Sequence, residues 1–124
     1  MRFMLMSRAD QHSEAGEFPT SEVMAEMGAF MEEITKAGVL ISAEGLLPSA
    51  GGSRITLSGG KLTVTDGPFP DTIANFAIVN VASKAEAIEW ASRWARLFGE
   101  LECEVRLISE MTDIPSEVAA ASNG

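Results

Sequence analysis

The fold of this chain depends on one stretch, Arg54-Ile55-Thr56-Leu57-Ser58-Gly59-Gly60-Lys61-Leu62-Thr63-Val64-Thr65. Apolar and polar residues alternate on both sides of a turn that contains a pair of glycines, which is a strong hairpin signal. We expect a β-hairpin over residues 54–65 with one face toward water. The two strands of a hairpin pair with each other, so we treat this hairpin as an insertion. The strands and helices before and after it then belong to one fold.

Upstream of the hairpin, the sequence predicts a strand and a helix. Phe3–Met6 is apolar at every position, which is typical of a short strand covered on both faces. The polar segment 7–19 predicts a loop. From a cap at Thr20 or Ser21, apolar residues recur at helical spacing as far as Gly38, so this segment predicts an amphipathic helix that packs on a sheet.

The segment Val39–Leu47 predicts a strand directly before the hairpin. Strict alternation places Ile41 and Ala43 on one face of this strand, and Ser42 and Glu44 on the other. Two polar side chains therefore share one side of a largely apolar strand. They are candidates for a ligand site if that side faces a cleft.

Downstream of the hairpin, the sequence predicts a strand, a helix and a final strand. Asn75–Val81 has the composition of a strand, and Ser83-Lys84-Ala85-Glu86 matches a capping box at the start of a helix. Gly99 ends that helix. Leu101–Leu107 then alternates apolar and charged residues, as a strand with one wet face does, and Cys103 occupies a position expected to be buried.

Without the hairpin, the predicted order is βαββαβ, which indicates a ferredoxin-like α+β fold with an inserted β-hairpin. Both helices then cover one face of an antiparallel sheet. The other face needs cover, so we expect a homodimer in which two sheets form an α/β barrel with a cleft between them. We expect the domain to span residues 1–111, and residues 112–124, rich in Ala and Ser, to form a flexible tail.

The charge balance restricts the partners of the chain. Its 124 residues include 9 basic and 18 acidic ones, for a formal net charge of −9. Such a field repels nucleic acid and anionic lipid, so neither is an expected partner. The apolar run at the N-terminus is too short for a signal peptide or a membrane span, which favours a cytoplasmic protein. The single histidine, His12, lies in the predicted loop without a second imidazole, which excludes a metal site built on histidines. We expect no metal site and no cofactor.

The loop after the hairpin, Asp66-Gly67-Pro68-Phe69, is the strongest candidate for a functional site. Glycine and proline give it a defined shape, and Asp66 could act there as a general base or hold a ligand donor. An Asp before Gly also forms turns by bonding nearby backbone amides, and that interpretation stays open. Phe69 is either the wall of a cleft or a plug that fixes the loop to the core. The candidate ligand-binding residues are Ser42, Glu44, Asp66, Gly67, Pro68 and Phe69.

Two segments of the chain resemble a known family. They are Ala37-Gly38-Val39-Leu40-Ile41-Ser42-Ala43-Glu44-Gly45-Leu46-Leu47-Pro48-Ser49 and Val64-Thr65-Asp66-Gly67-Pro68-Phe69. Both are similar to the YCII-related domain family, specifically its DGPF-motif branch, and the likeness extends over roughly residues 1 to 110. The resemblance implies a dimeric ferredoxin-like α+β barrel. It also implies a cleft, in which some members of the broader superfamily carry a His/Asp pair and are suspected enzymes.

This chain departs from the family pattern at two places. It has Ser21-Glu22 where the histidine-bearing members have their His, and Lys36 where they have their Asp, so that pair is absent. Many DGPF relatives continue the motif with Thr-Lys-Glu and Gly-Gly, whereas this chain continues as Asp71-Thr72-Ile73-Ala74-Asn75-Phe76.

Two functions therefore stay open for the chain. One is a small-molecule-binding or enzymatic dimer with a cleft near the DGPF motif. The other is a non-catalytic regulatory or interaction module. The resemblance implies a link between such a module and transcription control, because members of this family often occur beside alternative sigma factors.

Overall fold

The structure is a computed structural model, and it describes residues 1–118. The strands are β1 (Arg2–Arg8), β2 (Leu40–Gly45), β3 (Ser53–Ser58), β4 (Lys61–Asp66), β5 (Ile73–Asn80) and β6 (Cys103–Leu107). The helices are α1 (Gln11–Glu14), α2 (Ser21–Lys36) and α3 (Lys84–Arg96), with 3₁₀ turns η1 (Ser49–Gly51) and η2 (Met111–Asp113).

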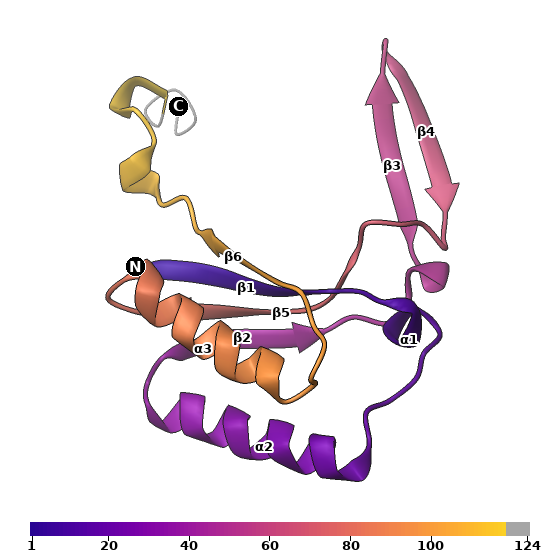
Figure 1. The fold of residues 1–124 in the computed structure, drawn as a ribbon. Coiled ribbons are helices and arrows are strands. Elements are labelled where there is room, and N and C mark those ends of the chain that lie inside the picture. Colours follow the sequence, from indigo (N-terminus) through magenta and orange to yellow (C-terminus); the bar gives the residue numbers. More distant parts are fainter. Residues whose placement is uncertain (119–124) are drawn as a thin grey trace.

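Four strands form an antiparallel sheet in the order β2-β5-β1-β6, while β3 and β4 pair with each other in a separate sheet. Helices α2 and α3 both lie on one side of the four-stranded sheet (Figure 1). This α+β arrangement is compatible with the predicted ferredoxin-like fold. Residues 1–118 contain no closed barrel, because the sheet ends at β2 and β6. A barrel built from two copies stays a prediction.

The core lies between the sheet and the two long helices. Phe3 on β1 and Val79 on β5 pair across the sheet and are 2% and 0% exposed. Phe30 and Ile34, one turn apart on α2, belong to the same buried cluster, and so does Ala87 of α3. Side chains alternate along a strand, so every second residue from Phe3 faces the helices.

Single hydrogen bonds mark the start of each long helix. Thr20, the first of the two predicted caps, caps α2, since its hydroxyl accepts the Val23 N–H. Ser83 caps α3 by accepting the Glu86 N–H. The predicted capping box is modified: the Glu86 carboxylate accepts the N–H of Ala82, one residue before the cap.

The prediction that residues 7–19 form a loop is wrong in two places. β1 continues as far as Arg8, which pairs with β5 beyond a register shift. The one-turn helix α1 follows and includes His12, which is exposed. Asp10 caps this turn, because its carboxylate accepts the Ser13 N–H while the Ser13 hydroxyl accepts the Asp10 N–H. Such a turn is stabilised by local polar hydrogen bonds, so the spacing of apolar residues does not predict it.

Strand β2 does not follow the strict alternation that the sequence suggests. Its register shifts between Leu40 and Ser42, so Ile41 is an extra residue. Leu40 pairs with Val79 and packs against the core, whereas Ile41 is 51% exposed. The predicted grouping of Ile41 with Ala43 is wrong, because an inserted residue reverses the alternation that follows it.

Strands β3 and β4 confirm the predicted hairpin. Gly59 and Gly60 form its two-residue turn with φ values of 58° and 77°, a conformation that favours glycine. The hairpin projects from the sheet on the side opposite the helices (Figure 1). The expectation of a single wet face is wrong, since every residue of both strands is exposed.

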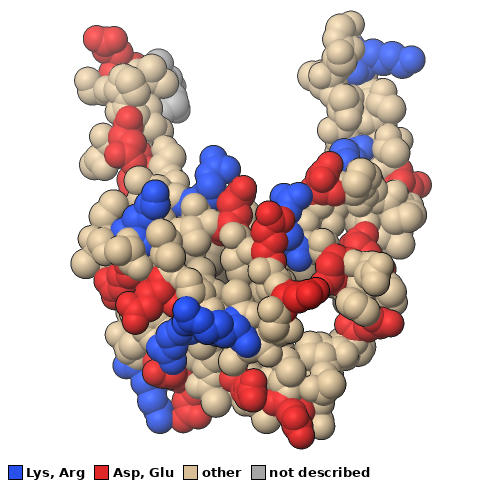
Figure 2. Space-filling model, viewed as in Figure 1, with Lys and Arg blue, Asp and Glu red and all other residues tan. Residues whose placement is uncertain are grey.

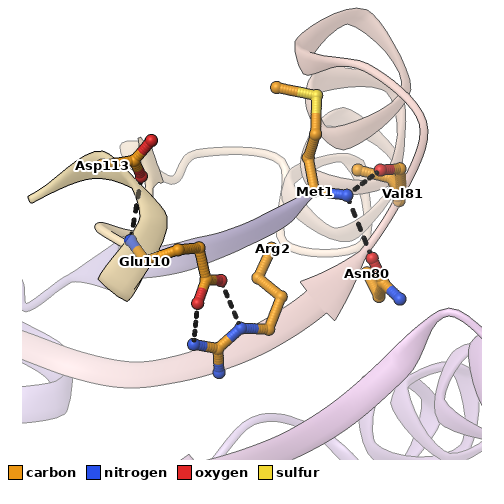
Figure 3. A network of polar contacts seen from close by, with 6 residues as sticks. All are labelled: Met1, Arg2, Asn80, Val81, Glu110 and Asp113. Atoms are coloured by element: carbon orange, nitrogen blue, oxygen red, sulfur yellow. Dashed lines mark hydrogen bonds and ion pairs between the residues drawn. The ribbon is translucent and has the colours of Figure 1, made fainter. Parts of the chain in front are cut away.

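The segment after β6 is bound to the start of β1 (Figure 3). The Arg2 guanidinium donates two hydrogen bonds to the Glu110 carboxylate, from Nε to Oε1 at 2.6 Å and from Nη2 to Oε2 at 2.9 Å. The side-chain bond from Arg2 lowers the pKa of Glu110. The Met1 ammonium donates to Asn80 Oδ1 at 3.1 Å. Part of the predicted flexible tail, residues 119–124, lies outside the described residues.

Candidate functional site

The DGPF loop, Asp66-Gly67-Pro68-Phe69, lies at the base of the hairpin and packs against η1. The Gly67 N–H donates to the Gly52 carbonyl at 3.0 Å, and the Gly67–Pro68 peptide bond is cis. A Cβ at Gly67 would lie 1.8 Å from the Ser49 carbonyl oxygen. The glycine of the motif is therefore required by the close approach of two backbone segments.

Ser49 connects the DGPF loop to α1. It is 8% exposed, and its hydroxyl donates to the Glu14 carboxylate and accepts the Phe69 N–H at 3.1 Å. The Ser49 N–H also donates to Glu14, at 3.0 Å. These two bonds, the side-chain one first, hold the pKa of Glu14 below its usual value. Helix α1, η1 and the DGPF loop thus form one bonded unit.

Asp66 and Phe69 make contacts on the outside of this unit. Asp66 is exposed, and its carboxylate accepts the Ser53 hydroxyl at 2.7 Å across the base of the hairpin. The Arg54 guanidinium lies 4.2 Å from the centre of the half-buried Phe69 ring and donates to the Pro70 carbonyl at 3.0 Å. The loop is therefore fixed at both ends, while the Asp66 carboxylate remains open to solvent.

Ser42 and Glu44 lie on β2. Ser42 pairs with Ile78 and Glu44 with Phe76, and opposite residues of antiparallel strands share a face. Register therefore places both side chains on the sheet face away from the helices, and both residues are exposed. Their grouping with Asp66 in one ligand site stays a prediction.

A cavity of about 310 Å³ lies on the other face, between the sheet and the helices. Its sheet wall consists of Leu5, Ser7, Leu40, Ala43, Glu44, Gly45, Asn75, Phe76, Ala77 and Cys103. Its helix wall consists of Met27, Phe30, Met31, Ile34, Trp90, Ala91 and Trp94. Among the predicted ligand-binding residues, Glu44 is the one that borders this cavity, although the register of β2 turns its side chain to the opposite face of the sheet.

Three polar side chains form a row across neighbouring strands of the sheet wall. Ser7 on β1 pairs with Asn75 on β5 and with Cys103 on β6. Ser7 is 2% exposed, its hydroxyl accepts the Trp94 Nε1–H at 3.0 Å, and it lies 3.8 Å from Cys103 Sγ. We call Ser7, Asn75 and Cys103 the polar row; it places hydrogen-bonding groups in a cavity that is otherwise mostly apolar.

The polar row carries no charge at neutral pH. Burial raises the pKa of the Cys103 thiol, and this effect outweighs the hydrogen bond between Cys103 and Ser7, which acts in the opposite direction. The thiol is therefore protonated, and the other two members are a hydroxyl and an amide. Neutral hydrogen-bonding groups suit this row better than ions do.

The aromatic residues of the helices line the cavity on the side opposite the sheet. The ring centre of Phe30 on α2 lies 5.5 Å from that of Trp94 and 5.9 Å from that of Trp90, both on α3. Arg93 lies 4.8 Å from the Trp90 ring centre and pairs with Glu33 of α2. These contacts join the two helices over the cavity.

The sequence pattern does not identify the polar row, because its members lie in three different contexts. Ser7 falls in the predicted loop, Cys103 in the predicted core, and Asn75 has no predicted role. The sequence carries one usable signal. Every second residue of a strand faces the same side, so Ser7 shares a face with Phe3, and Asn75 shares a face with Val79. Their pairing across the sheet comes from the register alone.

The fold and the cavity define a small α+β domain with room for a ligand between its sheet and its helices. A family model of the YCII-related domain matches residues 1–112, so the chain belongs to the YCII-related domain family. A search of curated proteins finds no match. Within residues 1–118, no helix is long and apolar enough to cross a membrane.

Proposed function

We propose that this protein binds a small, flat, uncharged molecule that is mostly apolar and carries one or two hydrogen-bonding groups. The observation that carries the proposal is the cavity of about 310 Å³ with the polar row in its wall. Ligand sites in proteins typically combine apolar walls with a few well-placed polar groups. The apolar part of the ligand contacts the helix residues, and its polar group bonds to the row.

The volume and the chemistry of the walls restrict the ligand further. An apolar cavity of ~150 Å³ is known to hold benzene, so this cavity has room for about two fused rings. Phe30, Trp90 and Trp94 supply aromatic contacts for such rings. A carboxylate or phosphate is disfavoured, because burying a charge without a partner costs several kcal/mol, of order 5 or more.

Naphthalene and 2-naphthol test this proposal, since they share one ring system and differ by one hydroxyl. A ligand that prefers the native state raises the melting temperature, which circular dichroism follows. We expect both compounds to raise it in a concentration-dependent manner. We expect 2-naphthol to bind about tenfold more tightly, as one net hydrogen bond of ~1.4 kcal/mol allows.

A matched pair of variants locates the binding. Ala91→Leu fills the cavity from α3 and is expected to abolish both shifts. Ala85→Leu places the same side chain at an exposed position of the same helix and is expected to preserve them. Binding that survives Ala91→Leu, in a variant with an unchanged circular dichroism spectrum, contradicts the proposed site.

Within the family, we assign the chain to the DGPF-motif branch, on the basis of Asp66-Gly67-Pro68-Phe69.

We also propose the exposed carboxylate of Asp66, with Ser42 and Glu44, as a second polar surface for a ligand. Asp66→Asn keeps the shape and removes the charge. If this variant lowers the melting temperature while ligand binding is unchanged, Asp66 stabilises the loop and does not bind a ligand.

A second candidate function is a regulatory or interaction module, with the link to sigma-factor control that the family resemblance suggests. The exposed apolar face of the hairpin supports it, because such surfaces mark interaction sites. A broad metabolite panel separates the two functions. If no compound of the panel raises the melting temperature, the interaction module is the better explanation.

A further inference from the structure

The polar row has a regular spacing, because its three members lie opposite one another on neighbouring strands. Ser7 on β1 is the central member, with Asn75 on β5 at one side and Cys103 on β6 at the other. Opposite residues of antiparallel strands have Cα atoms about 5.5 Å apart where the pair exchanges backbone hydrogen bonds, and about 4.5 Å apart where it does not. The backbone of the sheet therefore sets the spacing of the row.

Ser7 and Asn75 form a pair of the wider kind. The Val81 N–H donates to the Met1 carbonyl at 2.9 Å, and these two residues continue the register of β5 against β1. Bonded pairs recur at every second residue, and the register is unbroken from there to Ser7 and Asn75. The Cα atoms of Ser7 and Asn75 are therefore about 5.5 Å apart, and both side chains line the cavity.

The hydroxyl of Ser7 is available to a ligand as a donor. Its oxygen accepts the Trp94 Nε1–H at 3.0 Å, which fills one of its two lone pairs. Cys103 Sγ lies 3.8 Å away, and a thiol is a weak partner as donor or as acceptor. The Ser7 proton therefore goes to a stronger acceptor in the cavity, such as an oxygen of the ligand. The Asn75 amide both donates and accepts, so it bonds an oxygen of either kind.

Charge restricts the kind of oxygen that the row binds. In Figure 2, acidic side chains are spread over the visible face of the molecule, and the chain has a formal net charge of −9. Such a field repels anions, and the polar row has no cationic member that would pair with one. The oxygens that fit the row are therefore those of hydroxyl or carbonyl groups.

We propose that the ligand is a fused-ring aromatic molecule with two uncharged oxygens on non-adjacent carbons of one ring, bound by Ser7 and Asn75. Oxygens in such positions lie about 5 Å apart, close to the spacing of the pair, whereas oxygens on adjacent carbons lie at about half that distance. The second ring then contacts the aromatic side chains of Phe30, Trp90 and Trp94. The inference rests on the proposed function, because it concerns a ligand of the same cavity.

Two isomers test the spacing directly. 1,3-Dihydroxynaphthalene and 2,3-dihydroxynaphthalene have the same rings and the same two hydroxyl groups, and each contains the 2-naphthol unit. We expect the 1,3 isomer to bind about tenfold more tightly than 2-naphthol, as one further net hydrogen bond allows. We expect the 2,3 isomer to bind no more tightly than 2-naphthol, because its second oxygen does not reach the second strand. Isothermal titration calorimetry of the full chain measures the three dissociation constants.

A matched pair of variants assigns the second contact to Asn75. Asn75→Leu keeps the approximate size of the side chain and removes its hydrogen-bonding groups. The 1,3 isomer is expected to lose its advantage in this variant, while 2-naphthol still binds through Ser7. Asn80→Leu makes the same replacement at the exposed other end of β5 and is expected to keep the advantage.

Nuclear magnetic resonance gives a readout that does not depend on the variants. The side-chain amide signals of Asn75 are expected to shift more with the 1,3 isomer than with the 2,3 isomer when both are saturating, because a new hydrogen bond changes their environment.

The outcomes separate this inference from the proposed function. If the protein binds 2-naphthol but binds the two isomers equally well, the inference is overturned and the proposed function stands. If none of the three compounds binds, both are overturned. An advantage of the 1,3 isomer that survives Asn75→Leu also overturns the inference, because the second oxygen then lies elsewhere.

Discussion

Strand β5 and the hairpin strands β3 and β4 all carry aliphatic side chains, yet these side chains lie in opposite environments. Val79 on β5 is 0% exposed, whereas Ile55 on β3 is 66% exposed. β5 has a strand on each side and helices over one face, while β3 and β4 have only each other. Alternation therefore predicts a strand and its apolar face, but the cover of that face depends on the rest of the molecule.

The largest effect on stability is expected for a substitution in the buried strand β5. Val79→Asp buries a carboxylate without a partner, so we expect the free energy of unfolding to fall by at least about 4 kcal/mol. Ile55→Asp changes an exposed position, and we expect a change below about 0.5 kcal/mol in dilute protein. Urea unfolding followed by circular dichroism measures both. Equal losses in the two variants would show that the hairpin is part of the same core.

A smaller loss of stability is expected for a substitution where the hairpin joins the rest of the domain. Gly67→Ala places a Cβ against the Ser49 carbonyl, and we expect a loss of about 2 kcal/mol because two backbone segments must separate. Gly51→Ala is the matched control, since a Cβ there meets nothing within 4 Å. Thermal unfolding of both variants checks this. A Gly67→Ala variant as stable as Gly51→Ala contradicts the close approach.

The polar row allows the same comparison between a buried and an exposed side chain within the four-stranded sheet. Ser7→Ala removes the acceptor of the Trp94 Nε1–H, and leaving that group unpaired is expected to cost about 1 to 2 kcal/mol. Ser42→Ala makes the same change on the exposed sheet face, where we expect almost no loss. Urea unfolding measures the difference. If the two losses are equal, the bond between Ser7 and Trp94 does not stabilise the fold.

The smallest effect concerns pH and the bonds between Glu14 and Ser49. Because folding lowers the pKa of Glu14, its contribution to stability is present above the usual glutamate pKa and is lost as the pH falls through the lowered one. Glu14→Gln lacks this titration. We expect the melting temperatures of wild type and Glu14→Gln to differ at neutral pH and to converge in acid; a difference that stays constant with pH contradicts this.

The fold was predictable wherever the stabilising contacts are local. The caps at Thr20 and Ser83 and the turn at Gly59 and Gly60 follow from side chains and backbone angles within a few residues. The inserted residue Ile41 was not predictable, because it depends on how β2 registers against β5.

The candidate site was less predictable than the fold. The DGPF motif is visible in the sequence, but its partner Ser49 is not, since the hairpin lies between them. The cavity depends on Ser7 and Trp94, which are 87 positions apart. Nothing in the local pattern of either residue indicates that they meet.

The sequence by itself determined the order of the strands and of the two long helices, the hairpin turn and the family, because these depend on periodicity and on neighbours in the chain. The tertiary structure alone decided that Ser7, Asn75 and Cys103 form one row and that the apolar side chains of the hairpin are exposed. The physical reason is that pairing across a sheet joins residues far apart in the chain. Burial is a property of that assembly and not of any single strand.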